Sequence, residues 1–213
     1  MASVESFVFN MFSENTFVVY DETKECIIID PGCYDGNERK RLEHFIKKEG
    51  LTPVQLINTH CHVDHVFGNR FVAENWNLSL TIPDGEQVVL DAFVKVAQMY
   101  AIPNVQQSPD PEILLKEDDI IEFGNTILKV ISAPGHSPAG ICLYCAESNF
   151  LIAGDVIFEG SIGRTDLPGG DHDTLINNIK TKILTLPDNT LVYSGHGNTT
   201  TISRERRSNP FLQ

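Results

Sequence analysis

The run Thr59-His60-Cys61-His62-Val63-Asp64-His65 places three imidazoles and one carboxylate within six residues. It follows a short apolar stretch, residues 54–57, which is typical of a buried strand. Imidazole binds borderline divalent metals such as zinc, and carboxylate also accommodates harder ions. The run therefore predicts a metal site in a tight turn at the end of a strand.

Three polar residues further along the chain each follow a glycine, in Gly135-His136, Gly154-Asp155 and Gly195-His196. Glycine permits the sharp backbone turns that aim a neighbouring side chain inward. A lone histidine is usually a satisfied core residue, but the repeated pairing with glycine argues against chance. Together with the four groups of the first run these residues make seven ligands, which suit two metal ions better than one.

These motifs resemble the metallo-β-lactamase superfamily, which carries Thr-His-x-His-x-Asp-His, then Gly-His, Gly-Asp and a final Gly-His. The resemblance runs nearly from end to end. Further segments resemble the short glyoxalase II-like (hydroxyacylglutathione hydrolase-like) enzymes of that superfamily; they are residues 154–158, 163–171, 194–197, 200–202 and 209–212. The resemblance implies an α/β (α+β) fold, the αββα sandwich of two mixed β-sheets flanked by helices.

The resemblance also implies a ligand set. His60, His62 and His136 would hold one metal, Asp64, His65 and His196 the other, and Asp155 would bridge them. We expect two divalent ions, zinc in the first place, with iron or manganese as alternatives. A hydroxide shared by two such ions can attack a carbonyl carbon, and Asp64 would orient it or accept its proton as a catalytic residue.

The implied activity is that of a metal-dependent hydrolase, a thioesterase acting on an acyl thiol such as S-lactoylglutathione. Arg164 stands where related enzymes often carry lysine and would bind a substrate carboxylate, although an ion pair with Asp166 or Asp171 is the structural alternative. Two other activities stay open: a mononuclear-iron persulfide dioxygenase, which shares the Gly-Arg-Thr-Asp segment, and a hydrolase of lactones or other esters. A binding module with a vestigial site is disfavoured, because no ligand is missing.

Composition limits the classes of partner. A chain of 213 residues, 41% of them hydrophobic, can form one large core, and we expect a single domain over residues 1–213. With 16 basic against 29 acidic residues the net charge is −13, which excludes nucleic acid and favours a small-molecule substrate. The chain shows no membrane-spanning run and no secretory signal, so we expect no membrane association, a cytoplasmic location and no obligate protein partner.

Apolar periodicity predicts the remaining elements. Strands are expected at residues 4–9, 16–20, 26–30, 54–57, 120–123, 126–132, 141–144, 150–153 and 191–194, and helices at 37–48, 68–76, 86–101 and 174–184. Residues 102–111, which contain three prolines, are expected to form a loop, with a substrate lid as one interpretation. The five cysteines are an odd and scattered set, so we expect reduced thiols.

Overall fold

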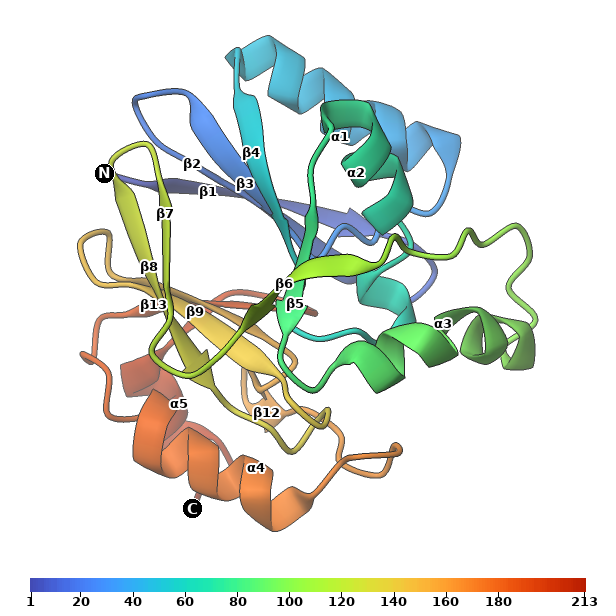
Figure 1. The fold of residues 1–213 in the computed structure, drawn as a ribbon. Coiled ribbons are helices and arrows are strands. Elements are labelled where there is room, and N and C mark those ends of the chain that lie inside the picture. Colours follow the sequence, from blue (N-terminus) through green and yellow to red (C-terminus); the bar gives the residue numbers. More distant parts are fainter. The chain divides into compact units, whose positions relative to one another are not determined.

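Two six-stranded mixed β-sheets organise the chain, and the computed structural model describes residues 1–213 (Figure 1). The chain folds into two compact units. The first unit comprises Met1–Leu115 and Glu122–Thr126, and the second comprises Lys116–Ile121 and Ile127–Gln213. Each unit is described by itself below. That a single domain spans residues 1–213 stays a prediction.

The sheet of the first unit has the strand order β1-β2-β3-β4-β5-β6. Its strands are β1 (Ser3–Phe9), β2 (Glu14–Tyr20), β3 (Glu25–Ile29), β4 (Thr52–Ile57), β5 (Leu80–Pro83) and β6 (Pro111–Leu115). The first three pair antiparallel, and they confirm the strands expected at residues 4–9, 16–20 and 26–30. From β3 to β6 the pairing is parallel, and parallel neighbours need crossover connections.

Three helices supply these crossovers: α1 (Gly36–Glu49), α2 (Asn69–Trp76) and α3 (Gln87–Met99). The ends of α1 follow from its sequence. The side chain of Asp35 accepts hydrogen bonds from the backbone of Asn37 and Glu38, and the Glu38 side chain completes a capping box. Gly50 then ends the helix in the left-handed region, with a φ of 65°. The helix expected at residues 37–48 is thereby confirmed.

The helices of the first unit bury their apolar stripes against its sheet. Leu42 of α1, Val72 of α2 and Phe93 of α3 belong to one core cluster, which also contains Ile28 and Leu56 from the strands. All five are at most 1% exposed, and burying a side chain of this size contributes about 1.5–3 kcal/mol. This core fixes β3 and β4, and therefore the residues that follow them.

The sheet of the second unit has the order β14-β13-β10-β9-β8-β7. Its strands are β7 (Ile120–Phe123), β8 (Thr126–Ser132), β9 (Ile141–Cys145), β10 (Phe150–Gly154), β13 (Leu191–Ser194) and β14 (Thr200–Thr201). The turn between β7 and β8 belongs to the first unit. β10 and β13 are parallel, while β8, β9 and β10 are antiparallel. A small hairpin, β11 (Ile157–Phe158) with β12 (Ser161–Ile162), follows β10.

Helices also pack on the second sheet. α4 (His172–Asn178) continues into a π-helical segment, Ile179–Ile183, and α5 (Ile202–Ser208) lies near the C-terminus. Leu175, Ile179 and Ile202 from these helices share a core cluster with Leu151 of β10 and Val192 of β13. Two mixed sheets, each with helices packed on it, confirm the expected fold class.

Five strands and one α-helix were not expected from the sequence: β5, β6, β11, β12, β14 and α5. Residues 102–110 form neither helix nor strand, as predicted, but Pro111 already begins β6. All five cysteines are buried and free, and Cys142 and Cys145 lie in β9. No helix is long and apolar enough to cross a bilayer.

Candidate metal centre

The histidine-rich loop begins where β4 ends, at Ile57. β3 and β4 are parallel with Ile29 opposite Ile57, so the residues that follow both strands leave the same edge of the sheet. Asp30 follows β3, and its carboxylate accepts hydrogen bonds from the Thr59 backbone at 2.6 Å and from the Thr59 hydroxyl at 2.5 Å. The entry to the loop is therefore fixed by a residue from the neighbouring strand.

Asp30 also contacts the far end of the loop. Its Oδ2 lies 3.2 Å from Nδ1 of His65, and both side chains are fully buried. A carboxylate beside one ring nitrogen of a ligand histidine fixes the orientation of the ring and leaves the other nitrogen to bind metal. One side chain thus positions both the start and the end of the candidate ligand loop.

Glu14 is a second buried carboxyl group behind the loop. Its Oε2 accepts a hydrogen bond from the Thr16 hydroxyl, and its Oε1 lies 3.9 Å from Nδ1 of His65. Burial raises the pKa of Glu14 well above its usual value; His65 opposes this shift, and Asp30 adds to it. His65 is therefore held in a polar pocket that contains two acidic side chains.

Glu86, directly before α3, supports the middle of the loop. Its Oε2 accepts a hydrogen bond from the backbone N–H of Cys61 at 2.9 Å, in a fully buried position. Burial raises the pKa of the Cys61 thiol well above its usual value, and the adjacent Glu86 adds to the shift. Cys61 is thus held as a buried neutral thiol, which excludes it as an activated nucleophile.

Within the first unit the loop brings its imidazoles together. The ring of His60 lies 4.8 Å from that of His62 and 4.1 Å from that of His65, measured between centroids. Asp64 Oδ2 is 3.8 Å from Nε2 of His65. His60, Asp64 and His65 are buried. The first unit therefore holds four of the seven predicted ligands in one cluster.

The second unit brings the other three together. His136 follows β8, Asp155 follows β10 and His196 follows β13. Nε2 of His136 and Nε2 of His196 each lie 3.5 Å from Oδ2 of Asp155. Because Gly154 pairs with Ser194 in parallel strands, Asp155 and His196 leave the same edge of the sheet. Two imidazoles thus converge on one carboxylate oxygen.

Backbone geometry explains two of the three glycines that precede these residues. Gly135 has a φ of 128° and Gly154 a φ of 48°, both in the region that favours glycine. Gly195 has no positive φ. Gly195 instead donates its N–H to the carbonyl of Gly154 at 2.8 Å. This hydrogen bond ties the chain before His196 to the chain before Asp155.

The donor chemistry of both clusters fits a divalent metal. The Nδ1 atom of His136 lies 2.8 Å from the carbonyl oxygen of Arg164. A carbonyl oxygen only accepts, so Nδ1 carries a proton in this contact, and Nε2 is the ring nitrogen left to bind a metal. Imidazoles and carboxylates suit zinc, iron and manganese alike. The grouping of all seven residues into one two-metal site stays a prediction.

Arg164 forms the ion pair considered above as the structural alternative. Its Nε and one terminal nitrogen each lie 2.7 Å from a carboxylate oxygen of Asp166, in a bidentate pair. Arg164 lowers the pKa of Asp166 to about 2. Both side chains are exposed, so the pair adds little to stability. Binding of a substrate carboxylate by Arg164 stays a prediction.

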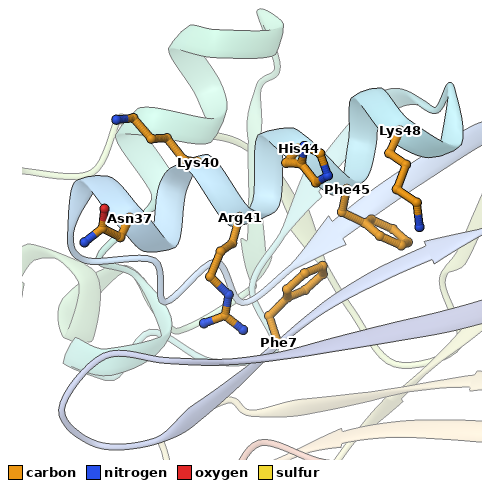
Figure 2. Close-up of a pocket in the computed structure, with 7 residues that line it drawn as sticks. All are labelled: Phe7, Asn37, Lys40, Arg41, His44, Phe45 and Lys48. Carbon is orange, nitrogen blue, oxygen red and sulfur yellow. The ribbon is translucent and has the colours of Figure 1, made fainter.

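A surface groove of about 570 Å³ lies along α1 (Figure 2). Figure 2 shows Arg41 pointing from α1 toward the strand that carries Phe7. The lining residues are Phe7, Asn37, Lys40, Arg41, His44, Phe45 and Lys48. The groove contains none of the seven predicted metal ligands.

Sequence reasoning missed three buried acidic residues, namely Glu14, Asp30 and Glu86. Each contacts the loop although it is distant in the sequence. The separation is 25 residues between Cys61 and Glu86 and 51 residues between Glu14 and His65. Only Asp30 could have been identified from the sequence, because it directly follows an apolar strand and precedes Pro31-Gly32. An acidic residue at the end of a buried strand is a candidate for such a contact.

Comparison with known proteins identifies related sequences. The family model described as the metallo-beta-lactamase superfamily matches residues 10–196. The probable metallo-hydrolase YqgX of Bacillus subtilis is 38% identical over 92% of this chain and 90% of its own length. The hydroxyacylglutathione hydrolase GloC of Haemophilus influenzae is 34% identical over 99% of this chain and 98% of its own length.

Solved structures show the same architecture. The crystal structure of BLEG-1 B3 metallo-beta-lactamase has a TM-score of 0.91 and 34% identity, covering 99% of this chain and 100% of that chain. The structure of TTHA1623 in a di-iron-bound form has a TM-score of 0.88 and 32% identity, covering 98% of this chain and 100% of that one. Residues 10–196, which the family model matches, include all seven predicted ligands.

Proposed function

Because the chain belongs to the metallo-β-lactamase superfamily and is a metal-dependent hydrolase with that fold, we propose that it hydrolyses acyl thioesters. The observation that carries the proposal is the similarity to hydroxyacylglutathione hydrolase GloC, which extends over 98% of that relative. The free cysteines are buried, so a water molecule rather than a thiol is the expected nucleophile.

We assign the two clusters to one two-metal site. His60, His62 and His136 would hold one ion, Asp64, His65 and His196 would hold the other, and Asp155 would be shared by both. When bound, such ions lower the pKa of a coordinated water and polarise a carbonyl oxygen. The convergence of His136 and His196 on one oxygen of Asp155 supports the bridging role. TTHA1623 binds two irons, which makes iron an alternative to zinc.

Asp64 is the residue that moves a proton in this proposal. Its backbone carbonyl accepts a hydrogen bond from the Asn10 side chain at 3.0 Å, which fixes the position of the residue. The Asp64 carboxylate accepts a proton from the attacking water as the new C–O bond forms. The C–S bond then breaks, and the departing thiolate takes up that proton. The products are a carboxylate and a free thiol, with one proton released to solvent.

A substrate panel tests the proposal. The protein, reconstituted separately with zinc, iron(II) and manganese(II), is assayed on S-lactoylglutathione, S-acetyl thioesters, γ- and δ-lactones, and β-lactams. We expect kcat/KM for a thioester to exceed that for every lactone and lactam in at least one metal form. Activity on lactones alone, or oxygen uptake with glutathione persulfide at one iron per chain, would overturn the assignment.

A further inference from the structure

One face of α1 lines the surface groove of Figure 2, which is called the α1 groove below. The lining residues of the helix recur every three or four positions, a spacing that places them on a single stripe. They are Asn37, Lys40, Arg41, His44, Phe45 and Lys48. The remaining lining residue, Phe7, belongs to β1, an edge strand of the first sheet. The groove therefore lies between a helix and a sheet edge of the same unit.

Two aromatic rings form the floor of the α1 groove. Phe7 and Phe45 make an edge-to-face contact at 5.4 Å between ring centroids. Phe7 is buried in the core of the first unit, and Phe45 is half-buried and packs against Tyr20 at 5.9 Å. The floor is therefore apolar and is held in place by the core.

The rim of the α1 groove is cationic. Lys40, Arg41 and Lys48 are exposed and permanently charged. α1 contains five basic and three acidic residues, although the whole chain has a net charge of −13. None of the acidic residues of α1 lines the groove. Glu38 completes the capping box, and Glu49 pairs with Lys48 at 3.3 Å on the surface, where such pairs are weak. The groove is thus a local positive surface on an acidic molecule.

Arg41 connects this rim to the edge of β1. A terminal nitrogen of Arg41 donates to the carbonyl oxygen of Val8 at 3.4 Å, and the guanidinium lies 5.2 Å from the centroid of the Phe9 ring. The carbonyl of Val8 therefore faces the groove. A strand edge of this kind favours an extended peptide as its neighbour, because main-chain groups of the two can pair.

The spacing of the charges also matches an extended peptide. Arg41 and Lys48 are about 10 Å apart along the helix axis, since each helical residue rises about 1.5 Å. In an extended chain, residues four positions apart are separated by about 13 Å and point to the same face. Flexible arginine and lysine side chains span the difference. Acidic residues four positions apart can therefore reach both cations, and the residue midway between them lies over the aromatic floor.

Two other kinds of occupant fit less well. The five polar lining residues are all exposed, whereas a site for a small molecule encloses most of its ligand. A symmetric contact between two copies of this chain would bring the cations of α1 against each other. We propose that the α1 groove binds an extended acidic segment of a partner protein, with two acidic side chains on the rim and an apolar side chain between them on Phe7 and Phe45.

A peptide titration tests the proposal on the zinc-loaded full-length protein. The probe, Thr-Glu-Thr-Leu-Thr-Glu-Thr with both ends blocked, presents its glutamates and its leucine on one face of an extended chain. The isomer Thr-Glu-Leu-Thr-Thr-Glu-Thr has the same charge but turns the leucine to the other face. Nitrogen-15 NMR spectra report the Kd and the residues whose signals shift. We expect saturable shifts in α1 and β1, and binding of the isomer that is weaker by about fivefold. No binding, shifts confined to other elements, or equal binding of the two peptides would overturn the proposal.

Charge reversal at the rim provides the matched comparison. Lys40→Glu combined with Lys48→Glu should weaken binding of the probe by about tenfold or more. Lys47→Glu combined with Lys95→Glu changes the net charge equally at exposed positions outside the groove, and should change the Kd by less than about threefold. Circular dichroism and metal content establish that each variant is folded. If the rim variant is unfolded, Lys40→Gln with Lys48→Gln takes its place, with an expected loss of about threefold. Equal losses in the rim and control variants would contradict the proposal.

Self-association and nucleic acid are tested in the same way. Light scattering after size-exclusion chromatography reports the oligomeric state without peptide, and a dimer that Lys40→Glu with Lys48→Glu dissociates would overturn the proposal in favour of a second copy. A DNA trinucleotide has the same charge as the probe, and binding of equal strength would overturn the choice of a peptide. We expect a monomer that binds the probe about tenfold more tightly than the DNA. Hydrolysis is measured in none of these experiments, so their outcome does not depend on the thioesterase proposal.

Discussion

Asp30 shows how much one residue outside the ligand motif contributes to a candidate metal centre. Its carboxylate accepts two hydrogen bonds from Thr59 and lies 3.2 Å from Nδ1 of His65. The histidines and aspartates of the motifs are recognisable in the sequence because they are clustered or follow glycine. Asp30, Glu14 and Glu86 are single acidic residues far from the loop in sequence, and only the strand pairing brings them to it.

Replacing Asp30 should lower the affinity for metal more than it lowers the free energy of unfolding. In Asp30→Asn the side chain keeps its size but loses the charge that orients His65, so we expect metal affinity to fall about 10- to 100-fold. Competition with a chromophoric chelator measures this affinity directly. Asp91→Asn, on the exposed face of α3, is the control and should bind metal like the wild type. Unchanged affinity in Asp30→Asn would show that Asp30 does not position the loop.

The ion pair between Arg164 and Asp166 should depend on pH. The arginine lowers the pKa of Asp166 to about 2 from a reference of 3.8, so the pair is present above pH 3.8 and is lost as the pH falls through about 2. Arg164→Gln should raise the pKa of Asp166 toward 3.8, as followed by carboxyl-carbon NMR. Asp171, whose pKa is lowered by Thr174 instead, should not respond. An unaltered pKa of Asp166 would mean that the two side chains are not paired in solution.

Among the elements, the sequence predicted the long periodic segments well, and the elements that it missed are all short. α1 and α3 carry apolar residues at helical spacing over more than three turns, and the apolar face of each helix is buried as expected. β5 has four residues and ends in proline, so no alternating pattern identifies it. α5 reads Ile-Ser-Arg-Glu-Arg-Arg-Ser, with one apolar residue, and depends on its Thr201 cap and on packing of Ile202. Such elements form through tertiary contacts that local pattern does not contain.

The turn before His136 should tolerate no side chain at Gly135. An added Cβ at Gly135 would lie 2.5 Å from the backbone nitrogen of Leu175, and the φ of 128° disfavours other residues. Gly135→Ala should therefore lower the free energy of unfolding by about 3 kcal/mol. Gly36→Ala, at the start of α1, meets no atom within 4 Å and should change it by less than about 1 kcal/mol. Guanidinium unfolding compares the two; equal stabilities would contradict the steric argument.

In the molecule as a whole, both units place their candidate ligands in the same way relative to their strands. In each unit, parallel strands end at a common edge, and the residues directly after them carry the candidate ligands or the carboxylates that orient them. The family resemblance predicted the two mixed sheets and the candidate ligands from motifs alone. It could not predict the contacts of Glu14 and Glu86 with the ligand loop, because both residues lie far from the loop in the sequence.

We propose that the seven candidate ligands bind two divalent cations. Metal content per chain, measured by inductively coupled plasma mass spectrometry after loading with zinc or iron(II) and removal of loosely bound ions, tests it most directly. We expect two ions per chain in the wild type, and about one in His196→Ala. A wild-type protein that retains one ion or none, or a His196→Ala variant that still retains two, would contradict it.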